Sequence, residues 1–156
     1  MTVIIRDGKF CEDEWLAAGG AFIPLDHFDL ETHERDPEVT GLDIPNSTDA
    51  AAIEGLLELV SAIRIPFPSF ADGRGFSIAK RLRQMGYQGL LRANGHILAD
   101  QYPLALRSGF DEIELPAPIA GRQPEKQWRD NITRVENNYQ DRLSGRNSSA
   151  RISEKA

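Results

Sequence analysis

Between residues 39 and 116, short apolar segments alternate with longer stretches in which apolar residues recur every three or four positions. The first pattern is typical of buried strands and the second of amphipathic helices. Strands are expected at residues 39–44, 63–67, 90–93 and 111–115. Because strands that alternate with helices form parallel sheets with right-handed crossovers, we expect an α/β fold. The sheet should be small and mostly parallel, built of repeated βα units, and either open or curved like half a barrel.

Three helices are expected between these strands. The first follows the N-cap candidates Ser47, Thr48 and Asp49, and its buried stripe is Ile53, Leu56, Leu57 and Val60. The second follows the loop at residues 69–75, and the third begins near His96 and ends at Gly109.

The two ends of the chain complete a single domain, predicted at residues 1–143. Residues 1–25 predict a β-rich lead-in, with a hairpin turn at Asp7-Gly8. Residues 124–143 predict an amphipathic helix that packs on the core or joins copies of the chain in a homo-oligomer. Its apolar stripe is Trp128, Ile132, Val135 and Tyr139. Residues 144–156 have no such stripe and predict a disordered tail.

The charge of the chain is unevenly distributed. The net charge of −6 argues against a nucleic-acid-binding protein. Residues 73–99 nevertheless contain five basic and no acidic residues, which indicates either a small or confined anionic partner or a solvated helix face. The chain has one cysteine and no apolar run near the ~20 residues of a membrane span. We therefore expect a cytoplasmic protein without membrane contact.

Polar residues follow three of the expected strands. Asn46 follows the first, the loop at 69–74 the second, and Asn94 and His96 the third. In parallel α/β sheets, ligands bind at the carboxyl ends of the strands. These residues should therefore converge on one edge.

The loop from Asp72 to Ser77 is the strongest candidate site. Two glycines free the backbone for close approach, and the helix that follows offers unpaired N–H groups. Arg74 could grip an anion with two hydrogen bonds, and Ser77 could donate a hydroxyl. The expected anion-binding residues are Gly73, Arg74, Gly75, Ser77 and Arg92. The alternative is structural: Asp72 makes an Asx turn and pairs with Arg74.

Further candidates lie around the third helix. His96 and Asp100 are four residues apart, so on one helix their side chains would meet, and Gln101 follows. If Arg92 is buried it needs an anion, which Asp72 or Asp100 could supply. No metal site and no cofactor are predicted, because the sequence contains no nucleotide fingerprint and no cysteine pair.

The middle of the chain resembles a known family. Residues 67–101 fit the signature FPxFxDGRGxSxAxxLRxxGYxGxLRAxGxxxxDQ, and RxGFD follows at residues 107–111. This signature is that of the bacterial domain-of-unknown-function family 934, whose members are labelled as oxidoreductases involved in sulfite reduction. Position 96 is acidic in many relatives. The resemblance therefore favours Asp72, Arg74, Arg92, Asp100 and Gln101 as site residues, with Asp72 and Asp100 as candidates for catalysis.

Three functions follow from these observations. The first is an accessory protein or oxidoreductase of assimilatory sulfite reduction, which holds a small anion or a partner enzyme at the Asp72–Ser77 loop. The second is a non-catalytic adaptor that docks on a sulfite reductase through Lys80, Arg83 and the C-terminal stripe. The third is an enzyme that acts on an unrelated phosphorylated metabolite.

Overall fold

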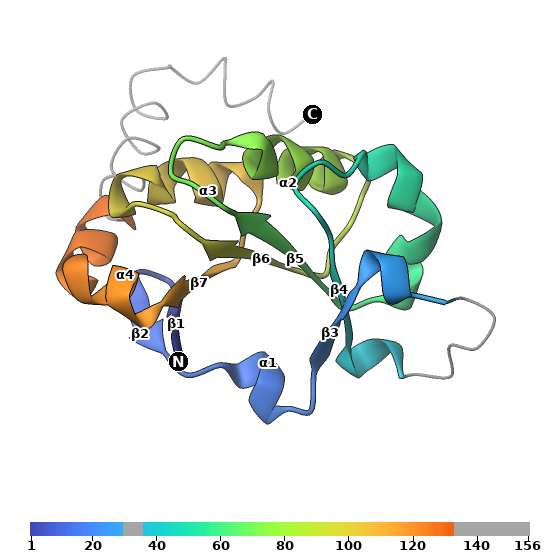
Figure 1. Ribbon diagram of the computed structural model, residues 1–156, viewed down its shortest axis with the longest axis horizontal. Helices are drawn as coiled ribbons and strands as arrows, with labels where there is room; N and C mark the ends of the chain where they lie inside the picture. The colour runs from blue at the N-terminus through green and yellow to red at the C-terminus, as the bar shows by residue number, and fades with distance from the viewer. Residues whose placement is uncertain (30–35, 133–156) are drawn as a thin grey trace, which may run out of the picture.

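The fold is an open, mostly parallel seven-stranded sheet with helices, as the computed structural model shows (Figure 1). The structure describes residues 1–29 and 36–132. The strand order is β2-β1-β7-β6-β5-β4-β3, with β3 to β7 parallel and β1 antiparallel to both β2 and β7. The strands are β1 (Thr2–Arg6), β2 (Lys9–Cys11), β3 (Ala21–Pro24), β4 (Thr40–Asp43), β5 (Ala62–Phe67), β6 (Leu90–Gly95) and β7 (Glu112–Pro116). The α/β class predicted from the alternating pattern is confirmed.

The parallel strands lie in sequence order, so the sheet is wound in one direction only. Helices α2 (Arg74–Gln84) and α3 (Tyr102–Ser108) cover the same face of the sheet (Figure 1). The connection between β4 and β5 is a 3-10 helix, Ala50–Leu59, where an α-helix was expected. Its Ile53 nevertheless belongs to the same buried core as residues of α2 and α3.

The N-terminal residues belong to the sheet itself. The hairpin turn at Asp7 and Gly8 is confirmed, with φ values of 53° and 74° that match a turn of inverted hand. The hairpin lies at one edge of the sheet, because β1 pairs with β7, whereas β3 forms the opposite edge beside β4. The chain between β2 and β3 must therefore cross the face that α2 and α3 leave open. This crossing contains the short helix α1 (Glu14–Ala17), and we call residues 12–20 the strap (Figure 1).

The beginning of the expected C-terminal helix packs against the core of its own chain. After α4 (Ala117–Arg122), residues 125–132 are helical. Trp128 is fully buried, its ring centroid lies 5.3 Å from that of Tyr102, and its indole N–H donates to the carbonyl of Gln123. Val135, Tyr139 and the tail at 144–156 lie outside the described residues, so a homo-oligomer through this helix stays a prediction. None of the helices described is long and apolar enough to cross a membrane.

Candidate functional site

The loops that follow β5 and β6 lie side by side at the carboxyl edge of the sheet. The two strands pair in parallel from Ala62–Leu90 to Phe67–Gly95, so both chains leave the sheet at the same level. Gly95 has φ +119°, and a Cβ at this position would lie 2.5 Å from the carbonyl oxygen of Phe67. Glycine is therefore required where the two loops approach each other.

Direct contacts join these two loops. Nδ1 of His96 lies 3.2 Å from the carbonyl oxygen of Pro68, and the ring centroids of Phe70 and His96 are 5.4 Å apart. The side chain of Gln101 donates to the carbonyl of Phe70 and accepts from the backbone N–H of Leu98. We call residues 68–77 and 96–101 together the rim. The structure thus brings His96 and Gln101 to the same edge as the loop at residues 69–74.

At the centre of the first rim loop, Asp72 and Arg74 form an exposed ion pair. Oδ1 of Asp72 accepts from the backbone N–H of Arg74 at 3.3 Å and from its Nε at 3.0 Å, and Oδ2 accepts from Nη2 at 2.9 Å. Oδ2 also accepts from the side-chain amide of Asn46. Hydrogen bonds from Arg74 hold the pKa of Asp72 well below its usual range. This is the arrangement of the structural alternative, an Asx turn closed by a neighbouring arginine.

The ion pair leaves little of Arg74 for another anion. Its side chain is 61% exposed, but Nε and Nη2 already bind Asp72, and only Nη1 has no partner in the part of the chain that the structure describes. Gly75 is buried, and a Cβ there would lie 2.6 Å from the ring of Phe67, so packing explains this glycine. Gly73 and Ser77 are exposed at the start of α2.

Arg92 is not part of the rim, which corrects the prediction that it binds an anion there. It is fully buried on the open face of the sheet. Its Nε and Nη2 donate to Glu112, both Nη atoms donate to Asp13, and Nη1 donates to Glu114. All five N–H donors of the guanidinium are therefore in use, and neither Asp72 nor Asp100 is a partner.

The environment of Arg92 favours its charged form. Burial by itself would lower the pKa of the guanidinium, but hydrogen bonds to Asp13 and attraction to Glu112 outweigh it and raise the pKa above the ordinary value. The same hydrogen bonds lower the pKa of Asp13. This is a mutually neutralised cluster with no donor left for a ligand.

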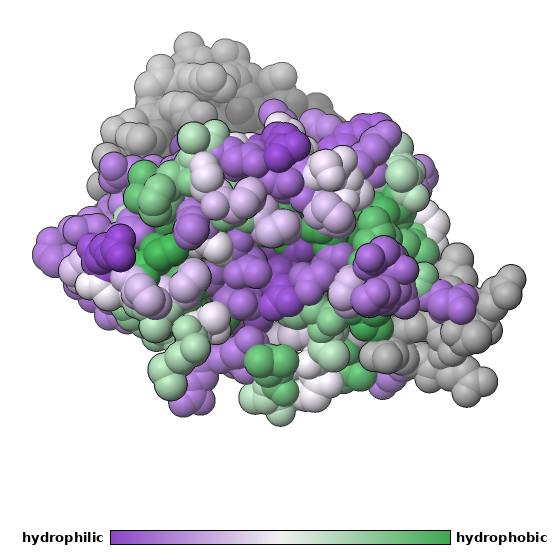
Figure 2. Space-filling model, viewed as in Figure 1, coloured by the Kyte–Doolittle hydropathy of each residue, from purple (hydrophilic) through white to green (hydrophobic). Residues whose placement is uncertain are grey.

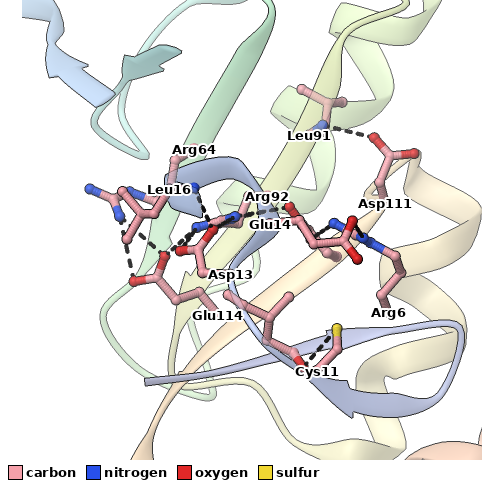
Figure 3. A network of polar contacts seen from close by, with 12 residues as sticks. Arg6, Cys11, Asp13, Glu14, Leu16, Arg64, Leu91, Arg92, Asp111 and Glu114 are labelled. Atoms are coloured by element: carbon pink, nitrogen blue, oxygen red, sulfur yellow. Dashed lines mark hydrogen bonds and ion pairs between the residues drawn. The ribbon is translucent and has the colours of Figure 1, made fainter. Parts of the chain in front are cut away.

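Arg92 is the centre of a longer row of charges across the open face (Figure 3). Arg64 binds Asp43 with Nε and Nη2, both at 2.6 Å, and reaches Glu114 with Nη1 at 3.1 Å. On the other side, Arg6 bonds to Glu112 and to Glu14 of the strap. The charged row thus comprises Arg6, Asp13, Glu14, Asp43, Arg64, Arg92, Glu112 and Glu114.

The edge strand β3 covers part of this row. The guanidinium carbon of Arg64 lies 4.4 Å from the ring centroid of Phe22, and that of Arg92 lies 5.2 Å from it, so both cations approach the same aromatic ring. A Cβ at Gly41 would lie 2.6 Å from Phe22, which explains why β4 has glycine beside this ring.

Sequence reasoning missed most of this charged row, although a local signal was present. In β5, Ile63, Ile65 and Phe67 are buried in the core, and Arg64 lies between them on the opposite face. The same alternation in β7 places Glu112 and Glu114 opposite Ile113 and Leu115. A period of two marks a sheet whose two faces differ, and it predicts charged groups on the second face.

The expected pairing of His96 with Asp100 is not found. No hydrogen bond or ion pair joins the two side chains among the described residues. The spacing argument required an α-helix from His96, but α3 begins at Tyr102 and residues 99–101 form a 3-10 turn. Asp100 is exposed and lines a surface pocket together with Gln127, Asp130 and Asn131. Asn94 lines a cavity together with Asp43 and Arg64.

The basic helix α2 offers less surface charge than expected. Lys80 is exposed, but Arg83 donates to the carbonyls of Tyr87, Gly89 and Gly109 and pairs with Asp111. Arg83 therefore ties α2 to the chain before β6 and β7. In residues 1–29 and 36–132, no three His, Cys, Asp or Glu side chains are placed to hold a metal ion.

Comparison with known proteins identifies a family model that matches most of the chain. A family model described as "Bacterial protein of unknown function (DUF934)" matches residues 41–149. This range contains the rim and most of the parallel sheet. No curated protein and no solved structure matches the chain.

Proposed function

We propose that this chain, which belongs to the bacterial family of unknown function DUF934, is a non-catalytic accessory protein of assimilatory sulfite reduction. In this role it docks on a sulfite reductase through the rim. The link to sulfite reduction comes from the resemblance of residues 67–111 to proteins that carry this label. In this proposal the redox chemistry belongs to the reductase, and this chain supplies the contact surface.

The observation that carries the docking role is the exposed apolar surface of the rim. Phe70 and Leu98 are 43% and 37% exposed, although large apolar side chains are usually buried. Gln101 links them, because it bonds to the carbonyl of Phe70 and to the N–H of Leu98. An aromatic anchor held in place before binding loses little conformational freedom when a partner covers it. The Asp72–Arg74 pair beside it supplies polar groups of both signs.

The affinity of the purified chain for the sulfite reductase of the same bacterium tests this proposal. Phe70→Ser and Leu98→Ser should each raise the Kd by about tenfold, the effect of losing an anchor worth about 1.4 kcal/mol. Leu16→Ser is the matched control, because Leu16 is 59% exposed on the strap rather than on the rim. An unmeasurable affinity of the unmodified chain, or an equal effect of Leu16→Ser, would contradict the docking role.

A small anion at Arg74 is the second candidate, because this side chain is exposed and its Nη1 has no partner in the described residues. It requires the anion to compete with Asp72, which already holds the guanidinium. Titration with sulfite, followed by NMR of the arginine side chains, distinguishes the anion site from the docking role. Saturable shifts at Arg74 that disappear in Arg74→Gln support the anion site, and their absence leaves docking as the function of the rim.

A further inference from the structure

A cavity of about 490 Å³ opens on the sheet at the carboxyl ends of β3 to β6, apart from the docking surface of the rim. Three prolines, Leu25 and Ile44 form most of its wall. Four polar side chains also line it: Asp26, Asp43, Arg64 and Asn94. Its size is typical of small-molecule sites, as is an apolar wall with a few polar groups. Its position is where parallel α/β sheets bind ligands.

Two of these four polar side chains, Arg64 and Asp43, already form an ion pair with each other. Nε and Nη2 of Arg64 bind the two oxygens of Asp43, and Nη1 reaches Glu114. The guanidinium carbon lies 4.4 Å from the ring centroid of Phe22. An anionic ligand would therefore have to displace a carboxylate from Arg64 before it could bind in the usual two-pronged manner.

The other two polar groups are available to a ligand. Neither Asp26 nor the side chain of Asn94 makes a hydrogen bond or ion pair with any residue of the described chain. Asp26 offers acceptors only, and the amide of Asn94 offers both donors and an acceptor.

The surrounding charge selects the sign of the ligand. In the charged row, three guanidinium groups face five carboxylates, so the row carries net negative charge. Asp26 adds a further carboxylate to the lining of the cavity. A low-dielectric cleft strengthens such a field and concentrates ligands of opposite charge.

We propose that this cavity binds a small organic cation, an amine on an apolar body, with the body against the prolines and the ammonium group between Asp26 and Asn94. The ammonium group donates to the carboxylate of Asp26 and to the amide oxygen of Asn94. This site is independent of the proposed docking role.

A larger cavity, about 870 Å³, is a weaker candidate. Its walls come from residues 54–61 and 85–89, at the amino ends of the strands. The hydroxyl of Tyr87 donates to the carbonyl of Val60, and that of Ser61 donates to the carbonyl of Pro37. The two hydroxyl groups that line this cavity are thus already used within the fold.

Two probes with similar apolar bodies and opposite charges test the proposal. Phenethylamine and 3-phenylpropionate are each titrated into the full chain, and backbone amide shifts are followed by NMR. Phenethylamine should produce saturable shifts at Leu25, Asp26, Ile44 and Asn94, weaker at high salt, whereas 3-phenylpropionate should not. Saturable binding of 3-phenylpropionate at these residues, or no shifts with phenethylamine, would overturn the assignment.

Two charge-matched variants locate the cation. Asp26→Asn should raise the Kd of phenethylamine about tenfold, because a charge-assisted hydrogen bond becomes a neutral one. Glu58→Gln changes the net charge equally at an exposed position of the other cavity and should leave the Kd within about twofold. Equal Kd values for the two variants would overturn the role of Asp26. Because no partner protein is present, failure here is distinguishable from failure of the docking proposal.

Discussion

Arg92 shows how this sheet accommodates a buried cation. A lone guanidinium without solvent would be very costly, but every N–H of Arg92 meets one of three carboxylates. Two of these carboxylates come from β7 and one from the strap, 20, 22 and 79 residues away in sequence. The sequence correctly indicated that a buried Arg92 needs an anion. It could not identify the partners, because they depend on which strands are neighbours.

Arg92→Leu should destabilise the protein by about 3–5 kcal/mol, the usual cost of leaving buried charges without their partner. The side chain of Glu112 is fully buried, so it would bear much of this cost. Urea unfolding at pH 7 measures the effect. Arg92→Lys keeps the positive charge but loses the planar fork. Its free energy of unfolding should lie between those of Arg92→Leu and the unmodified protein.

The matched comparison is Arg74→Leu, which removes an exposed arginine from a single ion pair. It should change the urea midpoint little, because water replaces the lost contacts. If Arg74→Leu destabilises as much as Arg92→Leu, the distinction between a structural arginine and a rim arginine is wrong.

The strap is the element that sequence reasoning did not anticipate. The hairpin, the parallel strands and α2 each follow from local patterns of apolar residues and turn residues. The strap follows from long-range pairing, because β1 joins β7 at one side and β3 joins β4 at the other. Asp13 caps α1 through the N–H of Leu16, and its carboxylate also holds the strap on Arg92.

Stability should fall in acid partly because the strap loses this contact. The pKa of Asp13 is lowered in the folded protein, chiefly by hydrogen bonds from Arg92. A lowered pKa gives stability that is present above the unfolded value, near 3.9, and is lost as the pH falls through the folded value. Urea unfolding between pH 7 and pH 2 should show this decline below about pH 4.

Asp13→Asn should remove that contribution, about 2 kcal/mol at pH 7, and make the acid decline shallower. Glu12→Gln, at an exposed neighbouring position of the strap, should follow the unmodified protein. A parallel acid decline in Asp13→Asn and the unmodified protein would show that Asp13 does not hold the strap.

At the scale of the whole molecule, the two faces of the sheet differ in composition and packing. One face packs the helices around a single apolar core, and the other carries the charged row beneath the strap. Hydrophilic residues gather in the middle of the view in Figure 2, between the helix layer and α1. The alternating pattern predicted the sheet and its carboxyl edge. It did not predict the charged face, because that face is marked only by the alternation of charged and apolar residues within single strands, as at Arg64 in β5 and at Glu112 and Glu114 in β7.

Hydrogen exchange of the chain, alone and with the sulfite reductase of the same bacterium, tests the docking role of the rim most directly. Partner binding should slow exchange at residues 68–77 and 96–101, because these loops become covered. Exchange in the strap and at residues 54–61 should not change. Protection confined to the strap or to residues 54–61, or no protection at the rim, would contradict the account.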